Sequence, residues 1–176
     1  MPAWLGSNGQ FEVAAAAAYA SHVESVWDYP RPPAVRPVAA TVRVRLAGEL
    51  LAQSGRALRV LETSHPPTIY VPGADIHHEW LVPSAARGSW CEFKGRARYV
   101  DAVIGNRRTP EVGWMYPDPM PDYAGLGDHI AFYPDRVDEA WIGNERVQAQ
   151  AGDFYGGWIT RELTGPFKGA PGTQGW

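Results

Sequence analysis

The chain has 176 residues, a formal net charge of −3 and an isoelectric point of about 5.9. This length suits about one domain. The lack of a basic stripe disfavours nucleic-acid binding. Its single cysteine, Cys91, excludes an internal disulfide framework and every zinc site built from several cysteines, and it is typical of a reducing, cytoplasmic setting. The 19 glycines and 16 prolines indicate many tight turns within a folded domain.

Residues 1–23 are predicted to be a lead-in to the domain. The alanine-rich run at 11–24 favours a short helix, because alanine is the best helix former. The longest apolar run, 13–20, is too short to span a bilayer. No basic segment followed by an apolar one is present, so we expect neither a signal peptide nor a membrane span. We place a single domain at 24–176.

A proline-rich strap follows at residues 27–37. Its four prolines predict an extended path, because proline fixes its own backbone and restricts the residue before it. Trp27 and Tyr29 are expected to hold this strap against the chain's own core. A proline-rich segment can also bind a partner domain, so an interaction surface is an alternative.

From residue 41 onward, apolar and polar residues alternate with the period of a β-strand. Val42, Val44 and Leu46, for example, fall on one face. The pattern predicts about ten short strands with tight turns and little helix. Strands do not alternate with long helices, so we predict a mainly β fold, an antiparallel barrel or sandwich. Strands are expected at 41–48, 49–53, 57–63, 68–71, 112–116 and 129–134, strand pairs at 91–105 and 138–149, and helical turns at 72–76 and within 117–129.

Glu62 stands out because it lies in an otherwise apolar strand. A buried carboxyl group has a raised pKa and becomes suited to general acid–base chemistry. Tyr70 and Asp75 are expected to flank it. The alternative is structural: Glu62 pairs with an arginine such as Arg59 or Arg98, and Asp75 caps a helical turn.

The tripeptide Phe-Lys-Gly occurs at 93–95 and again at 167–169. A glycine turn lets the backbone approach a ligand closely, and Lys94 or Lys168 beside it can bind an anion or act as a base. Exposed turn lysines are the simpler interpretation. Cys91 is a candidate for contact with a ligand, although a lone strand cysteine is usually a small buried hydrophobe.

Two further motifs carry weaker signals. His77 and His78 are adjacent, and adjacent side chains point in different directions, so we expect no metal site there. Two glycines separate Tyr155 from Trp158. That bend can form the aromatic wall of a pocket for flat rings or cations, or it can simply pack in the core.

Several motifs follow one another along the chain: ESVWDYPRPP, VLETSHPPTIYVPGADI, CEFKGRARY, WMYPDP, HIAFYPDRVD and the tail FYGGWIT to GTQGW. In this order they resemble the DUF427 family of uncharacterised bacterial and fungal proteins, in its longer bacterial form. The resemblance covers about 24–176, and the part shared with the shortest members is about 61–138. It implies a fold similar to the Mss4-like class, with coiled antiparallel sheets also called a β-tent. Relatives in that class often carry zinc on two CxxC pairs, which one cysteine cannot form, and one distant branch binds cyclic imides in an aromatic cage. A nucleotidyltransferase label attached to the family has no visible basis in these residues.

We therefore expect a pocket for an unknown small molecule, and acid–base chemistry without a cofactor if the protein is an enzyme. Neither nucleic acid nor membrane is an expected partner, and the sequence does not specify an oligomeric state. The alternatives are a non-catalytic aromatic-cage binding module and an interaction domain that uses the strap. The catalytic candidates are Glu62, Lys94, Tyr70 and Asp75, and the ligand-binding candidates are Trp27, Tyr29, Cys91, Tyr155, Trp158 and Lys168.

Overall fold

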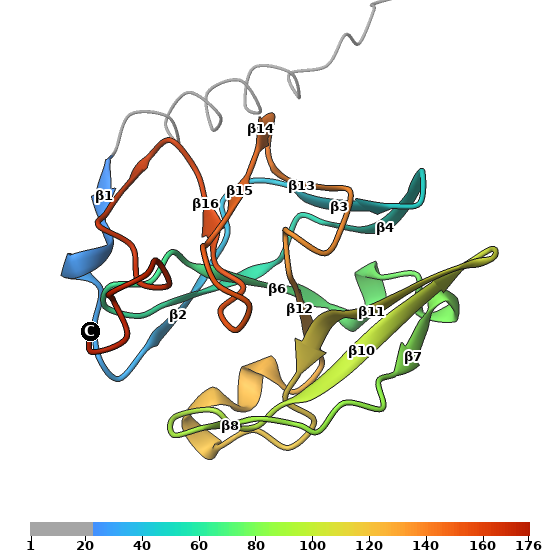
Figure 1. The fold of residues 1–176 in the computed structure, drawn as a ribbon, viewed down its shortest axis with the longest axis horizontal. Helices are drawn as coiled ribbons and strands as arrows, with labels where there is room; N and C mark the ends of the chain where they lie inside the picture. The colour runs from blue at the N-terminus through green and yellow to red at the C-terminus, as the bar shows by residue number, and fades with distance from the viewer. Residues whose placement is uncertain (1–22) are drawn as a thin grey trace, which may run out of the picture.

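The computed structural model describes residues 23–176 (Figure 1). The helix predicted in the lead-in lies outside the described residues. The described chain is mainly β, as predicted, and the relation to the Mss4-like class stays a prediction. None of its helices is long and apolar enough to cross a membrane. They are the 3-10 helices η1 Val26–Asp28, η2 Gly73–Asp75, η3 His78–Trp80 and η4 Pro121–Leu126.

The larger sheet has seven strands in the order β2-β5-β6-β12-β11-β10-β7, and each neighbouring pair is antiparallel. Within the described residues its outer strands, β2 and β7, do not pair with each other, so the sheet is open and not a closed barrel. Its strands are β2 Ala34–Pro37, β5 Leu58–Leu61, β6 Thr68–Pro72, β7 Leu81–Pro83, β10 Arg98–Ile104, β11 Arg107–Met115 and β12 His129–Phe132.

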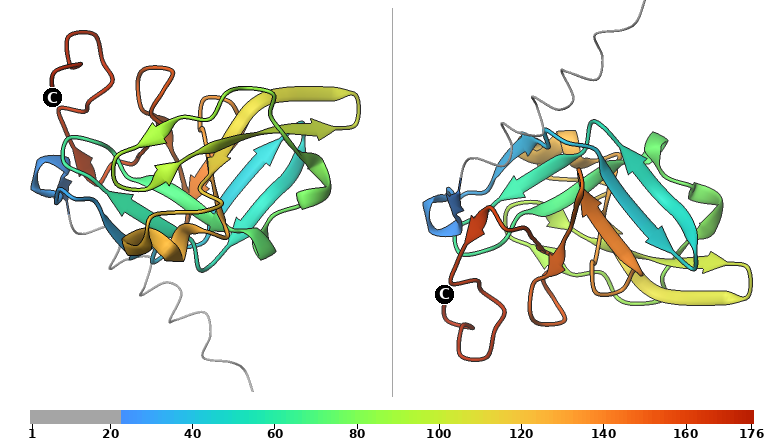
Figure 2. Two further views of the ribbon diagram at one scale, coloured as in Figure 1. Left: turned by 90° about the horizontal axis from the view of Figure 1, so that it is seen from below. Right: turned by 90° about the horizontal axis from the view of Figure 1, so that it is seen from above.

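A second sheet of four strands, in the order β14-β13-β3-β4, supplies the other side of the main core (Figure 2). The alternation predicted for β3 is confirmed, since Val42, Val44 and Leu46 are at most 1% exposed. They pack with apolar residues of the larger sheet, such as Ile69 and Val71 of β6. The strands of this sheet are β3 Val42–Leu46, β4 Glu49–Ser54, β13 Glu139–Ile142 and β14 Glu145–Arg146.

Three two-stranded pairs complete the fold. β8 (Trp90–Cys91) and β9 (Gly95–Arg96) form a small antiparallel hairpin, and so do β15 (Gln148–Ala149) and β16 (Trp158–Ile159). The third pair is parallel and joins β1 (Glu24–Ser25) to β17 (Leu163–Thr164). This pairing brings the first described strand to the C-terminal segment, and Figures 1 and 2 show both at the same end of the molecule.

The opposite face of the larger sheet carries an aromatic cluster. Side chains alternate along a strand, so Tyr70 points away from the main core while its neighbours point into it. Trp114 of β11 lies on the same aromatic face, next to Tyr116 and Tyr133. This face, and not the main core, positions the site described below.

The last four residues of the strap belong to the larger sheet. These residues, Ala34–Pro37, form β2 and pair with β5. Tyr29 is 8% exposed and packs with Val26, Leu61 and Leu163, as predicted for a strap held on its own core, whereas Trp27 is 42% exposed and lies outside this cluster. The strand predicted at 57–63 ends at Leu61, so Glu62 lies just beyond its end.

Candidate functional site

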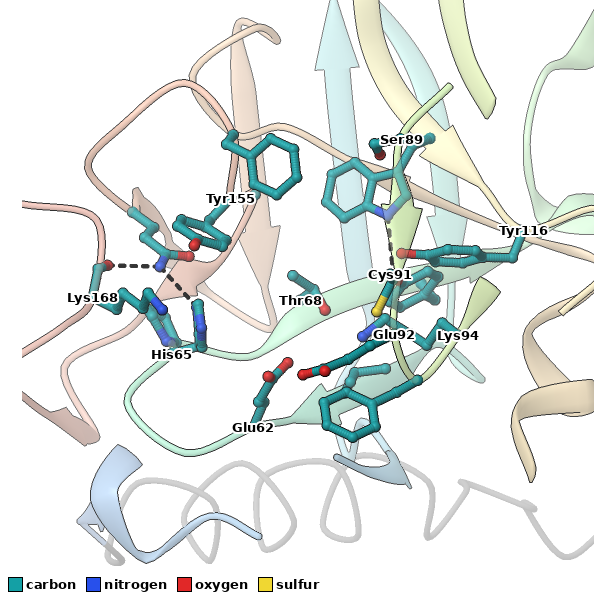
Figure 3. A pocket seen from close by; sticks show the side chains of 18 of the residues that line it. Glu62, His65, Thr68, Ser89, Cys91, Glu92, Lys94, Tyr116, Tyr155 and Lys168 are labelled. Atoms are coloured by element: carbon teal, nitrogen blue, oxygen red, sulfur yellow. Dashed lines mark hydrogen bonds between the residues drawn. The ribbon is translucent and has the colours of Figure 1, made fainter. Parts of the chain in front are cut away.

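A cavity of about 390 Å³ opens on the aromatic face (Figure 3). Its walls come from segments that are far apart in the sequence: the strap, the β5–β6 turn, the β8–β9 hairpin, and the loops after β15 and β17. Aromatic side chains dominate the lining, and lysines, a histidine, carboxylates and the cysteine are set among them. The lining includes Arg31, Glu62, His65, Thr68, Tyr70, Trp90, Cys91, Glu92, Phe93, Lys94, Tyr99, Trp114, Tyr116, Tyr133, Gln150, Phe154, Tyr155 and Lys168.

The floor of the cavity is built from aromatic rings of β6, β11 and the following residues. The indole N–H of Trp114 donates to the Tyr70 hydroxyl at 3.2 Å, and the two rings meet edge to face with centroids 6.1 Å apart. Burial raises the pKa of Tyr70, Tyr116 and Tyr133 above the ordinary value for tyrosine. These hydroxyls therefore remain protonated and neutral, which leaves charge recognition to other side chains.

Lys94 is the buried cation of the site. It lies in the β8–β9 hairpin, which turns at Gly95 with a φ of 97° that favours glycine. The residue is only 7% exposed. Within the described part of the chain its Nζ makes no hydrogen bond or ion pair. Its one recorded interaction there is a cation–π contact with the Tyr123 ring, whose centroid is 6.0 Å away. Figure 3 shows the side chain directed into the cavity from the hairpin side.

His65 lies in the turn between β5 and β6, and its contact with Gln150 determines which ring nitrogen carries the proton. The Gln150 oxygen accepts from the Gly157 amide at 3.1 Å, and its nitrogen donates to the Lys168 carbonyl at 2.7 Å. The same nitrogen lies 3.2 Å from His65 Nδ1. Since that amide nitrogen can only donate, Nδ1 must be the acceptor, and the proton of neutral His65 is on Nε2.

The charge of His65 is set by burial and by the cations around it. Burial first, and then Lys168, Lys94 and Arg31, lower the pKa of His65 from 6.5 to about 4. At neutral pH the ring is therefore uncharged. Its Nε2–H has no partner among residues 23–176 and is available to the cavity that His65 lines.

Glu62 enters the cavity from the end of β5. Its side chain is 20% exposed, and the nearest cation is Arg31, with 3.7 Å between Nη1 and Oε1. The pairing with Arg59 or Arg98 that was the structural alternative is not formed, and Arg59 binds Glu24 instead. No described residue donates a hydrogen bond to the Glu62 carboxylate, and Figure 3 shows it directed towards the cavity.

The rim is formed by the strap and two loops. Arg31 binds Glu92 at 2.7 Å and stacks over the Phe93 ring, with 5.4 Å from Cζ to the centroid. Two large aromatic residues at the mouth are unusually open, with Trp90 68% and Phe154 59% exposed. These two rings add apolar surface to an entrance that also carries the Arg31–Glu92 ion pair.

The C-terminal wall carries Tyr155 and Lys168. The Tyr155 ring meets the His65 ring edge to face at 4.7 Å. Lys168 Nζ lies 5.7 Å from the centroid of Tyr155 and donates to the carbonyl of Trp176. Lys168 is thus already engaged by the chain, whereas Lys94 is not.

Four predicted site residues do not line the cavity. Asp75 belongs to η2, where it accepts from Ser54 at 2.6 Å and pairs with Arg56. Trp158 is on the core side, 1% exposed, and donates to a backbone carbonyl at 3.0 Å. Trp27 packs on Trp176, and Tyr29 donates to Glu24 at 2.6 Å. The other six, Glu62, Tyr70, Cys91, Lys94, Tyr155 and Lys168, line the cavity together.

Sequence reasoning missed several lining residues. Trp114 and Tyr116 alternate on β11 and the residue after it, and this period was a signal for one shared face. Arg31 and Gln150 gave no local signal, because the pairing of distant strands brings them to the cavity. No group of histidine, cysteine, aspartate or glutamate within 23–176 is gathered closely enough to hold a metal ion.

Comparison with known proteins adds one match. A family model described as a domain of unknown function (DUF427) matches residues 34–143, which is more than half of the chain. The search of curated proteins found no match to the chain. The matched segment contains the cavity floor, Glu62, His65 and Lys94, while Arg31, Gln150 and Lys168 lie outside it.

Proposed function

We propose that the chain, which belongs to the DUF427 family of domains of unknown function, uses its cavity to bind a small organic anion with a flat apolar body. One observation carries the proposal: Lys94 is buried in an aromatic cavity without an anionic partner among the described residues. A buried charge is costly unless it is paired. A ligand carboxylate would supply the missing partner.

The electrostatics of the cavity support an anionic ligand. Three cations, Lys168, Lys94 and Arg31, each lower the pKa of His65, so the potential at that ring is positive. Arg31 is shared between Glu62 and Glu92, and Lys168 is held by the C-terminal carbonyl. Lys94 is the cation left for a ligand.

The shape of the cavity supports a flat ligand. Its volume of about 390 Å³ is near the lower end of the ~300–1,000 Å³ range of small-molecule sites. Tyr155, Phe154 and Trp90 offer aromatic surfaces at the wall and mouth. Rings stack favourably on such surfaces, at about 0.5–1.5 kcal/mol for each contact beyond the area buried.

The cavity is also favoured over the strap as the functional surface. Strap residues Ala34–Pro37 are paired in the sheet, and Arg31 forms part of the cavity wall. A non-catalytic aromatic cage remains compatible with the same ligand class, because binding by Lys94 requires no chemistry.

Benzoate and phenylglyoxylate, two flat carboxylates, test the proposal in a titration calorimeter. A hydrogen bond to a charged group contributes about 1.5–3 kcal/mol, so Lys94→Met should raise the Kd by about 10–100-fold. Arg87→Met removes one positive charge from an exposed residue outside the cavity and is the matched control. Equal affinity of the wild type and Lys94→Met, or no binding of either acid by the wild type, would contradict the proposal.

A further inference from the structure

Three polar groups of the cavity form no hydrogen bond with the described residues. Within residues 23–176, Lys94 Nζ, His65 Nε2–H and the Glu62 carboxylate have no hydrogen-bond partner. All three residues line the same cavity, and Figure 3 shows Glu62 and Lys94 entering it from different sides. The residue Lys94 is buried, and Glu62 and His65 are partly buried beside it. Polar groups in such a setting usually have hydrogen-bond partners, so these two donors and one acceptor point to a ligand with matching chemistry.

We propose that the cavity is the active site of an enzyme that moves a proton at the carbon next to the carbonyl of an oxo acid. The proposal rests on the anion binding argued above, and it assigns that anion a second functional group. Lys94 holds the carboxylate, His65 donates from Nε2 to the carbonyl oxygen, and Glu62 takes the proton.

The step balances without a cofactor. The Glu62 carboxylate removes a proton from the carbon next to the carbonyl, and the electron pair of that C–H bond forms the carbon–carbon double bond of an enolate. The carbonyl π electrons move to oxygen, where His65 Nε2–H and the nearby positive charge of Lys94 stabilise the oxyanion. Protonated Glu62 then returns a proton to carbon, so the enzyme and the ketone are regenerated.

His65 suits the role of donor and not of base. Its Nδ1 is occupied by the Gln150 amide, which leaves only a protonated nitrogen facing the cavity. A neutral imidazole that donates to a developing oxyanion is an established catalytic arrangement. Gln150 is a positioning residue in this scheme, since it is 3% exposed and its amide nitrogen lies 3.2 Å from His65 Nδ1.

Glu62 suits the role of base better than the other carboxylate of the lining. Glu92 is 65% exposed and is held by Arg31 at 2.7 Å, so its oxygens are neutralised at the rim. Glu62 is 20% exposed and lies 3.7 Å from the same arginine. Its oxygens are closer to the interior and free to accept a proton.

Deuterium exchange measured by proton NMR tests the activity directly. The protein is incubated in D₂O with phenylpyruvate, 2-oxobutyrate or levulinate, which differ in the spacing of carbonyl and carboxylate. We expect the signal of the hydrogens next to the carbonyl to decay faster than in buffer alone for at least one acid. Phenylglyoxylate, an oxo acid with no such hydrogen, reports binding alone. Binding of these acids without accelerated exchange would overturn this inference and leave the proposed function standing, whereas absence of binding would overturn both.

Variants separate the roles. Glu62→Gln should slow exchange at least about 100-fold, the usual contribution of a general base, while phenylglyoxylate binding is retained. Glu62→Asp withdraws the carboxylate by one methylene and should slow exchange as well. This variant tests the assignment of the base if Glu62→Gln does not fold. Glu49→Gln changes an exposed carboxylate outside the cavity and is the control. Exchange at the wild-type rate in Glu62→Gln would refute the assignment of the base.

Nitrogen-15 NMR tests the role of His65. The proton is expected on Nε2 at pH 7 in the wild type, and Gln150→Leu should release this preference. His65→Phe, which keeps a ring but has no N–H donor, should slow exchange about 100-fold, as expected for the loss of one oxyanion donor. A proton on Nδ1 in the wild type would rule out the proposed donor.

Discussion

Acidification should destabilise the fold through His65, and replacement of this histidine should remove that effect. The ring is neutral in the folded protein because burial and three neighbouring cations lower its pKa to about 4. In the unfolded chain the pKa returns to its ordinary value of 6.5. Between these two values the unfolded state binds a proton that the folded state does not, so the free energy of unfolding decreases as the pH falls from 6.5 towards 4.

The magnitude follows from the same two values. At pH 5 the unfolded histidine is almost fully protonated and the folded one is almost neutral. The pH then lies about 1.5 units below the unfolded-state pKa, which lowers the free energy of unfolding by about 2 kcal/mol. This is a large fraction of the ~5–15 kcal/mol that stabilises a typical domain. Burial also lowers the pKa of His129, but its contribution is common to the wild type and a His65 variant and cancels in their difference.

Urea unfolding at pH 7.5 and pH 5 measures the effect. The wild type should lose about 2 kcal/mol more than His65→Gln between the two pH values. His77→Gln, which replaces an exposed histidine outside the cavity, should lose as much as the wild type. Equal losses in the wild type and His65→Gln would show that His65 is not a neutral buried ring, and the donor role argued from it would fail.

Two further substitutions test the packing around the site and the sheet. In Gly156→Ala the new Cβ would lie 2.4 Å from the Trp114 ring. We therefore expect the free energy of unfolding in urea to fall by about 1–3 kcal/mol and phenylglyoxylate to bind more weakly. The control Gly55→Ala has open space around its Cβ and should show neither effect. Asp101 is 4% exposed and accepts from a backbone amide at 2.8 Å and from Arg108 at 2.7 Å, so Asp101→Ala should cost about 2–4 kcal/mol. Arg108→Met should cost less, because the amide contact remains, and an equal cost would contradict this division.

Strands β3, β4 and β13 of the second sheet were predictable because one face of each is buried in the main core, whereas β7 (Leu81–Pro83) was not predicted. The alternation at Val42, Val44 and Leu46 marks β3 directly. A period of two does not say which of two covered faces borders a cavity, however. Tyr70 on β6, expected to flank Glu62, lines the cavity, whereas Trp158 on β16, a candidate for an aromatic wall, lies on the core side.

The site was predictable only where its residues are unusual for their local setting. Glu62 follows an apolar strand and Lys94 precedes a glycine turn, and both are visible in a short window of sequence. Gln150 is different, since its contact with His65 spans 85 residues. Such a contact depends on the order of strands in the sheet, which local pattern does not determine.

The parallel pair of β1 and β17 bears on the order in which the chain folds. It joins Glu24 to Leu163 through two residue pairs only, and closing so long a loop costs entropy before any contact repays it. We expect this pair to form late, after the larger sheet. Arg31 follows β1 and Lys168 follows β17, so the rim and the C-terminal wall reach the cavity last. A chain synthesised only as far as β12 would carry the aromatic floor without a finished pocket, and ligand binding would therefore report that the segment up to Lys168 has docked.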